Sequence, residues 1–213
     1  MKRRPWEKYW EEIIEPSTFL RNSKHETHPV RELIALYAAK YANVLEAGCA
    51  TAVDLPIHEH FDTLYYGLDI TEKFILEARK RYPNYWLEVG SILDIPLKSE
   101  SIDTTYVKAV LEHMHPLEWV LGVQELWRVA KHQMILAFFN YNPDRPKAPI
   151  LERMEKEDAD RCPKQAFNNR IPTQDIQDVL FNLGATSWKR LIVGGKRDNT
   201  TKYKPYLVYV IEK

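Results

Sequence analysis

Two acidic residues, Glu46 and Asp69, each stand at the end of a short aliphatic run. Such runs favour buried strands, and the first is followed at once by a turn of small residues, from Gly48 to Ala52. A turn of this kind lets the backbone approach a ligand closely and leaves amide groups there to hold polar ligand atoms. An acid at the end of the second strand lies beside that turn and accepts both hydroxyls of a ribose. The spacing therefore predicts a nucleoside site, with a helix N-terminal acid as the alternative interpretation of Asp69.

A third stretch of small and polar residues follows further along the chain. Gly90, Ser91 and Ile92 come after a third apolar run, and an Ile-Pro-Leu segment leads from them into a fourth strand that ends at Val107. Beyond that strand the chain reads Leu-Glu-His, ending at His113. A turn that only packs the edge of a sheet accounts for the apolar residues here, but not for their order relative to the two acidic strand ends. The order therefore favours a binding site made from several strand ends.

The first turn resembles motif I of the class I S-adenosylmethionine-dependent methyltransferases, which is an acid and any residue followed by Gly-x-Gly-x-Gly. Here the pattern is Glu46-x-Gly48-x-Ala50-x-Ala52, so alanine replaces two of the three glycines. The stretch from the third strand to the Leu-Glu-His segment closely resembles the small-molecule branch of that family, typified by enzymes of ubiquinone and menaquinone biosynthesis. The whole resemblance covers about residues 44–139.

The resemblance implies S-adenosylmethionine as the cofactor and a set of residues that bind it. These residues lie at the ends of the first four expected strands: Glu46, Gly48, Cys49, Ala50, Asp69, Ile70, Ser91, Ile92 and Lys108. In the small-molecule branch an acid usually stands in place of Ser91 and binds the adenine amino group, a contact that a serine hydroxyl makes more weakly. Ile92 is expected to pack on the adenine ring, where its backbone amide reads a ring nitrogen.

Two residues are candidates for catalysis. His113 is expected to act as a general base, because imidazole titrates near neutral pH; the alternative is that it satisfies backbone groups near a helix start. Tyr141, beyond the fifth strand, is expected to orient the acceptor or contact the sulfonium. Lys108 is expected to face an anionic substrate. No metal-ligand spacing occurs in the sequence, so His58 and His60 are interpreted as surface residues.

Strands that alternate with helices predict a doubly wound α/β fold, with a mostly parallel seven-stranded sheet covered by helices on both faces. In the first half of the chain, periodicity predicts a helix over 5–15, a helix from Pro29, a strand ending at Glu46, a short helix over 55–61 capped by Asp54, a strand over 64–69 and a helix over 71–82. Strands are then predicted over 85–89 and 101–107, followed by a helix over 116–129 that buries Leu121 and a strand over 133–139. The chain is predicted to end with a helix capped by Thr173 and an antiparallel pair of strands over 188–193 and 206–211.

The length of 213 residues predicts a single domain over 1–213. The helices within residues 1–42 are expected to form a cap. The connection over 140–171 is long, proline-bearing and charged. Long connections in compact domains tend to be functional, and ligands bind beyond the carboxyl ends of parallel strands. We therefore expect this insertion to lie over the pocket of the methyl acceptor.

Composition limits the partners of the chain. Thirty basic residues balance thirty acidic ones, which argues against a nucleic-acid surface and favours a small-molecule acceptor. Cys49 and Cys162 are the two cysteines; they indicate no disulfide framework, and a cytoplasmic location is expected. No apolar run is long enough to span a bilayer, and no signal-peptide pattern opens the sequence. The oligomeric state is left open, with a homodimer as one alternative.

Three functions compete at this point. The first is a methyltransferase that acts on a small molecule. The second is a nicotinamide-dependent oxidoreductase, which requires a Gly-x-Gly-x-x-Gly turn that Gly48 to Val53 does not supply. The third is a binding protein that keeps the fold or the cofactor pocket without catalysis, an alternative to which Ala50, Ala52 and Ser91 give weight.

Overall fold

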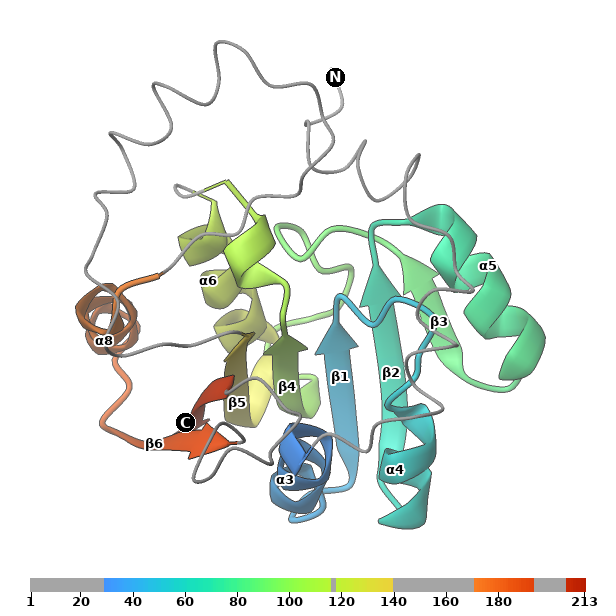
Figure 1. Cartoon of the computed structure of the whole chain (residues 1–213), viewed down its shortest axis with the longest axis horizontal. Coiled ribbons are helices and arrows are strands. Elements are labelled where there is room, and N and C mark those ends of the chain that lie inside the picture. The colour runs from blue at the N-terminus through green and yellow to red at the C-terminus, as the bar shows by residue number, and fades with distance from the viewer. Residues whose placement is uncertain (1–28, 116–117, 140–170, 194–205) are drawn as a thin grey trace, which may run out of the picture.

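A computed structural model of the chain contains one seven-stranded sheet, with the strand order β3-β2-β1-β4-β5-β7-β6 (Figure 1). The structure describes residues 29–115, 118–139, 171–193 and 206–213. The strands are β1 (Asn43–Ala47), β2 (Leu64–Asp69), β3 (Trp86–Val89), β4 (Ile102–Lys108), β5 (Ala130–Phe139), β6 (Ser187–Val193) and β7 (Tyr206–Glu212). The first five strands pair in parallel, whereas β7 runs antiparallel to both β5 and β6. The expected sheet is therefore confirmed, including its antiparallel closing pair.

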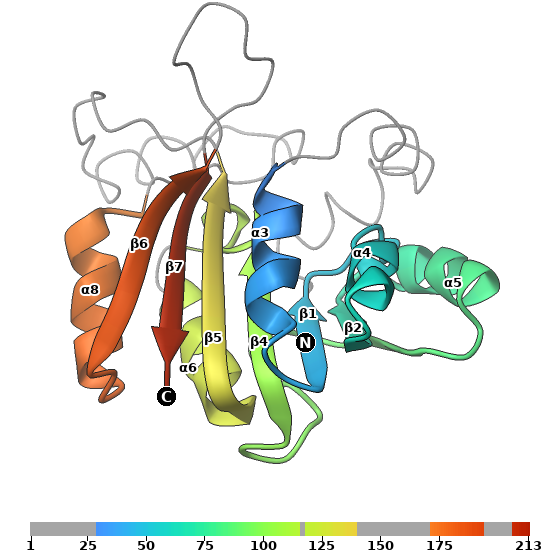
Figure 2. The same cartoon turned by 90° about the horizontal axis from the view of Figure 1, so that it is seen from below.

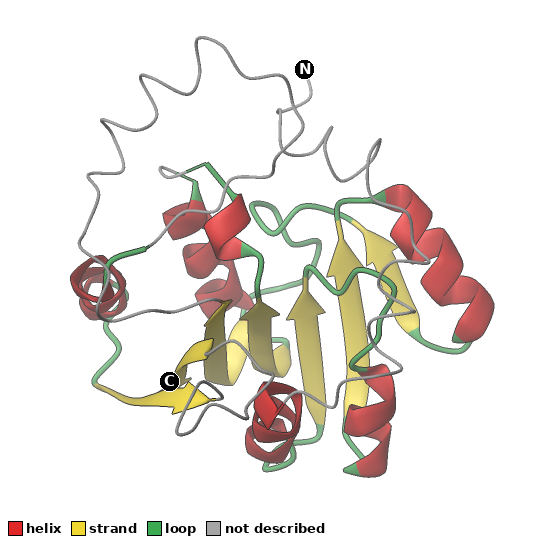
Figure 3. Cartoon of the chain, viewed as in Figure 1, coloured by secondary structure: helices red, strands yellow, loops and turns green. Residues whose placement is uncertain are grey.

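Helices cover both faces of this sheet, as the doubly wound fold requires (Figures 2 and 3). On one face lie α3 (Pro29–Ala38), α4 (Leu55–His60) and α5 (Glu72–Arg81), which contribute Ile34, Leu55 and Ile75 to one buried cluster. On the other face lie α6 (Trp119–Val129) and α8 (Thr173–Asn182), which contribute Leu126 and Leu180 to a second cluster. A short 3-10 helix, η1 (Leu111–His113), follows β4.

The central strands are buried because helices cover them from both sides. In β1 every residue from Val44 to Ala47 is buried, and β4 is buried from Thr104 to Val107. The parallel register aligns β1 with β2 and β4, so that Ala47 lies beside Leu68 and Val107. The acidic strand ends and the residues after β4 are thereby brought to the same edge of the sheet.

Three expectations about the helices are wrong in detail. Asp54 precedes α4 at its cap position, but its carboxylate makes no capping hydrogen bond. Thr173 is the first residue of α8, and Pro172 occupies the cap position. In α6 the expected inward residue Leu121 is 50% exposed, while Trp119, Gly122 and Val123 are buried.

Some expected features fall on residues that the structure does not describe. The helix over 5–15 and the insertion over 140–170 lie outside the described residues, as does Tyr141. Of the cap expected over 1–42, the structure describes α3 and the turn that follows it. Among the described helices, none has the length and apolar character that crossing a bilayer requires.

Candidate functional site

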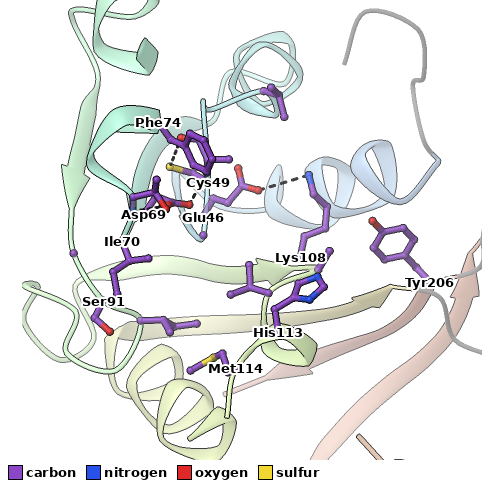
Figure 4. Close-up of a pocket in the computed structure, with 18 residues that line it drawn as sticks. Glu46, Cys49, Asp69, Ile70, Phe74, Ser91, Lys108, His113, Met114 and Tyr206 are labelled. Carbon is purple, nitrogen blue, oxygen red and sulfur yellow. Dashed lines mark hydrogen bonds and ion pairs between the residues drawn. The ribbon is translucent and has the colours of Figure 1, made fainter. Parts of the chain in front are cut away.

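A pocket of about 260 Å³ opens at the carboxyl ends of β1, β2, β3 and β4 (Figure 4). The structure brings the expected cofactor residues together around it, along with His113 from η1. The wall consists of Glu46, Gly48, Cys49, Ala50, Val53, Asp69, Ile70, Thr71, Phe74, Gly90, Ser91, Ile92, Lys108, Ala109, Val110, His113, Met114 and Tyr206. Residues far apart in the sequence meet here because parallel strands deliver their ends to one edge.

The turn after β1 is tied to β2 through its own amide groups. The backbone amides of Gly48 and Cys49 both donate to the carbonyl oxygen of Leu68, at N···O distances of 2.7 and 3.0 Å. The amide of Ala50 donates to Oδ2 of Asp69 at 2.8 Å. The expectation that this turn leaves its amides available to a ligand is therefore wrong for these three residues. Their hydrogen bonds instead attach the turn to the end of β2.

The turn keeps a left-handed backbone even where alanine replaces glycine. Gly48, Ala50 and Ala52 have φ angles of +83°, +47° and +53°. At Gly48 an added Cβ atom would lie 2.3 Å from Cγ2 of Val110, so a side chain has no room there. The one glycine that is retained stands where a methyl group does not fit. The two alanines accept a conformation that costs an L-residue about 1–2 kcal/mol.

Relief of this cost gives a first prediction. We expect Ala50→Gly to raise the free energy of unfolding by about 0.5–1 kcal/mol, because the relieved strain exceeds the added freedom of the unfolded chain. Ala78→Gly is the matched control: Ala78 is buried within α5, so its replacement should lower stability by about 1 kcal/mol or more. Urea unfolding of both variants measures the two shifts. A loss of stability in Ala50→Gly similar to that in the control contradicts the prediction.

Asp69 accepts backbone hydrogen bonds from two segments of the pocket wall. Its side chain is 8% exposed and lines the pocket. Oδ2 accepts the amide of Ala50, and Oδ1 accepts the amide of Thr71 at 2.8 Å, just before the start of α5. Asp69 therefore joins the turn after β1 to the N-terminus of α5.

The loop after β3 forms another part of the wall. Ser91 Oγ accepts the amide of Leu93 at 3.2 Å, a local turn typical of serine. Gly90 donates its amide to the carbonyl of Asp69 at 2.9 Å, which ties the loop to β2. Ile92 is 7% exposed and packs against Gly122 of α6. The loop thus presents an apolar side chain next to a hydroxyl that already accepts a backbone hydrogen bond.

A buried charge cluster lies behind the turn after β1. Asp54 pairs with Nε of Arg31 at 2.6 Å and with Nζ of Lys108. Lys108 Nζ also lies 3.6 Å from Oε1 of Glu46. Burial acts to raise the pKa of Asp54, but Lys108 and Arg31 outweigh it and hold that pKa below its ordinary value. Lys108 was expected to face an anionic substrate. In the structure, its ammonium group instead faces two carboxylates of the chain itself, those of Asp54 and Glu46.

Glu46 has a different environment from Asp54. Its side chain is 2% exposed, and Oε2 accepts the hydroxyl of Tyr65 at 2.5 Å. Burial and the neighbouring charge of Asp54 raise the pKa of Glu46 to about 7, against the opposing effects of Lys108, Tyr65 and Tyr106. Near neutral pH the carboxyl group of Glu46 is therefore present in both its protonated and its ionised form.

His58 belongs to the same cluster. Its Nε2 lies 3.2 Å from the hydroxyl of Tyr106, and its side chain is 1% exposed, so the interpretation of His58 as a surface residue is wrong. Burial lowers its pKa to about 4, which leaves the ring neutral. Within the described ranges, no three His, Cys, Asp or Glu side chains lie close enough to hold a metal ion.

The far wall of the pocket contains residues that the sequence analysis missed. Tyr206 lies on this wall, and the register of β7 against β5 places it opposite Phe139 (Figure 4). Burial, followed by the charge of Glu112, raises the pKa of the Tyr206 hydroxyl. Met114 and His113 lie on the segment after β4. The register of the expected closing pair was the signal that locates Tyr206, because it brings the start of β7 to the carboxyl end of β5.

Comparisons with known proteins agree with this geometry. Residues 45–138 match a family model described as "Methyltransferase domain". A curated protein of Mycolicibacterium smegmatis, named as a probable S-adenosylmethionine-dependent methyltransferase, is 31% identical over 72 residues. That match covers 34% of this chain and 28% of the relative, so the chain spans under a third of the relative's length.

Solved structures share the fold over nearly the whole chain. Magnesium protoporphyrin IX methyltransferase from Synechocystis PCC 6803 with bound SAH is 17% identical, with a TM-score of 0.63, and the match covers 98% of this chain and 93% of that one. An S-adenosylmethionine-dependent methyltransferase from Aquifex aeolicus is 16% identical, with a TM-score of 0.60 and coverage of 93% and 98%. At these identities the likeness concerns the fold.

Proposed function

We propose that this chain binds S-adenosylmethionine in the pocket at the ends of β1 to β4 and transfers its methyl group to a small-molecule acceptor, because residues 45–138 match the family model described as "Methyltransferase domain". The observation that carries the proposal is the left-handed turn at Gly48, which has no room for a side chain, next to the buried carboxylate of Asp69. A backbone that close to the pocket and an acceptor for ribose hydroxyls are what an adenosyl ligand needs.

Each of the three parts of the cofactor is assigned to residues of the pocket wall. Asp69 is assigned to the ribose hydroxyls, while Ile92 and Ser91 are assigned to the adenine ring. Glu46 and Cys49 lie at the end of β1 and in its turn, where the methionyl part is assigned. S-adenosylmethionine supplies a methyl group already activated by its sulfonium, so the protein need not provide a strong electrophile.

The remaining work of the chain is to position the acceptor and exclude water. Tyr206, Val110 and Met114 line the side of the pocket next to His113, and we assign the acceptor to that side. His113 is the candidate general base for an acceptor hydroxyl or a protonated nitrogen. Tyr141 remains a candidate for orienting the acceptor. A cytoplasmic location, with no binding of nucleic acid, is part of the same proposal.

Two other functions remain as outcomes of the test. A nicotinamide-dependent oxidoreductase would need a glycine where Val53 stands, and Val53 is part of the pocket wall. A binding protein without catalysis would keep the pocket and lack turnover. Neither alternative accounts better for the match over residues 45–138.

Calorimetric titration of the full chain with S-adenosylmethionine, S-adenosylhomocysteine and NAD separates these functions. We expect both adenosyl ligands to bind at one site per chain and NAD not to compete with them. Binding of NAD alone would overturn the proposal in favour of the oxidoreductase. Binding of S-adenosylmethionine with no methyl transfer in a broad screen of small acceptors would favour the binding protein.

A further inference from the structure

The ammonium group of Lys108 contacts two carboxylates, those of Asp54 and Glu46, at unequal distances. Its ammonium group makes its closest contact with Asp54, which is also paired with Arg31, and lies 3.6 Å from Oε1 of Glu46. The positive charges of Arg31 and Lys108 therefore stabilise the carboxylate of Asp54 more than that of Glu46. Glu46 is left with partial compensation from one distant ammonium group and with hydrogen bonds from tyrosines.

Glu46 is nonetheless the carboxyl group of this cluster that lines the pocket. The groups that face it come from every element around it. They are Tyr65 on β2, Tyr106 and Lys108 on β4, Asp54 before α4 and Cys49 in the turn. Arg31 on α3 and His58 on α4 face Asp54, and Asp69, His113 and Tyr206 lie elsewhere on the pocket wall. Of these, His58 is neutral, and Tyr65 and Tyr106 keep their protons because burial raises the pKa of each hydroxyl.

We propose that Glu46 is the residue by which this pocket distinguishes S-adenosylmethionine from S-adenosylhomocysteine: binding of the first displaces the proton of Glu46, whereas binding of the second leaves the protonation of Glu46 as it is in the chain without ligand. The proposal rests on the proposed function, since it assigns the same pocket to the same ligands. Under this proposal, the proton of Glu46 is released to solvent when the charged ligand replaces the uncharged one.

The sign follows from the charges of the cluster. With Glu46 ionised, the two cations Arg31 and Lys108 are balanced by the two anions Asp54 and Glu46. With Glu46 protonated, the cluster carries one positive charge in excess, which repels a cationic ligand. S-adenosylmethionine carries a sulfonium charge that S-adenosylhomocysteine lacks. Binding of the sulfonium form therefore favours loss of the Glu46 proton, while the thioether form gives no such gain.

The affinity of the two ligands should then respond differently to pH. The pKa of Glu46 lies at about 7 in the chain without ligand, so affinity for S-adenosylmethionine should rise with pH up to and through neutrality. Affinity for S-adenosylhomocysteine should rise less. The ratio of the two dissociation constants should change by up to about tenfold per pH unit below pH 7 and level off above it.

Proton release on binding tests this inference without relying on activity. Each ligand is titrated at pH 7 in two buffers of different ionisation enthalpy, and the difference in heat gives the number of protons exchanged. We expect S-adenosylmethionine to release a fraction of a proton more than S-adenosylhomocysteine, since both forms of Glu46 are populated near that pH. Equal proton counts for the two ligands would overturn the inference, and this comparison needs no variant.

Glu46→Gln shows whether Glu46 is the source of that proton. The ligands' own ammonium groups, Asp69 and His113 contribute to both proteins, so the difference between wild type and variant isolates Glu46. We expect the extra proton to vanish in Glu46→Gln and to persist in Glu88→Gln, where Glu88 is a half-buried glutamate of β3 that pairs with Arg79 outside the pocket wall. An extra proton that survives in Glu46→Gln contradicts the inference. If neither ligand binds wild type, it is the proposed function that fails.

Discussion

Replacing Asp54 with Asn is expected to lower the free energy of unfolding by about 3–5 kcal/mol, the cost of removing one partner from a buried ion pair. Asp54 is 1% exposed and pairs with both Arg31 and Lys108, whose side chains are 16% and 14% exposed. Asparagine keeps the shape but leaves these two cations without the carboxylate between them. Urea unfolding at pH 7 measures the loss.

Lys80→Met is the matched control for this prediction. Lys80 pairs with Glu77 on the surface of α5 at 3.6 Å, and its side chain is 74% exposed. An exposed pair of this kind contributes about 0–1 kcal/mol. A loss in Asp54→Asn that is no larger than in Lys80→Met would show that the cluster is not holding α3 and β4 to the turn.

The contribution of Asp54 should also depend on pH. Because its pKa is lowered in the folded chain, its stabilising effect is present above the unfolded pKa of about 3.9 and is lost as pH falls through the lower folded value. The stability difference between wild type and Asp54→Asn should therefore shrink at the acid end. A difference that grows on acidification would contradict this assignment.

Replacing Asp69 with Ala is expected to weaken binding of S-adenosylmethionine by about 1–3 kcal/mol, or roughly ten- to a hundredfold. The reason is the loss of the charged acceptor assigned to the ribose hydroxyls. The same change also removes the acceptor for the amides of Ala50 and Thr71, so the turn itself loosens. Isothermal titration calorimetry gives the dissociation constants.

Adenosine and 2′,3′-dideoxyadenosine separate the two effects in the same experiment. Loosening of the turn weakens both ligands alike, whereas loss of the ribose contact weakens only adenosine. We therefore expect wild type to prefer adenosine and Asp69→Ala to lose that preference. Asp178→Ala, at an exposed aspartate of α8, should keep it. A preference retained in Asp69→Ala would remove Asp69 from the ribose site.

Much of the fold and the outline of the pocket could be predicted from the sequence. Strands such as β1 and β4 are short segments rich in β-branched and apolar residues, and parallel order alone brings Glu46, Asp69 and Lys108 to one edge. The sequence could not predict how Asp54 is used. A position before a proline-bearing helix suggests a cap, but two cations from α3 and β4 compete successfully for its carboxylate.

The phase of α6 shows a second limit of sequence patterns. Its buried residues include Trp119, Gly122, Val123 and Leu126, whereas the expected buried stripe included Leu121, which is exposed. Both faces offer large apolar residues, so periodicity does not choose between them. Gly122 lies on the buried face, where an added Cβ would meet Ile92 at 3.5 Å, an ordinary contact distance. A glycine carries no hydrophobic signal, so the sequence pattern does not mark this position as buried.

The position of β7 inside the sheet has a consequence for how the chain is made. Residues 206–212 are synthesised after every other described strand, yet they lie between β5 and β6 and supply Tyr206 to the pocket. While these residues are still inside the ribosome, the edge of β5 that later pairs with β7 is exposed. An exposed strand edge of this kind can pair with other chains. Assembly of the pocket therefore has to wait until residues 206–212 have left the ribosome and paired with β5.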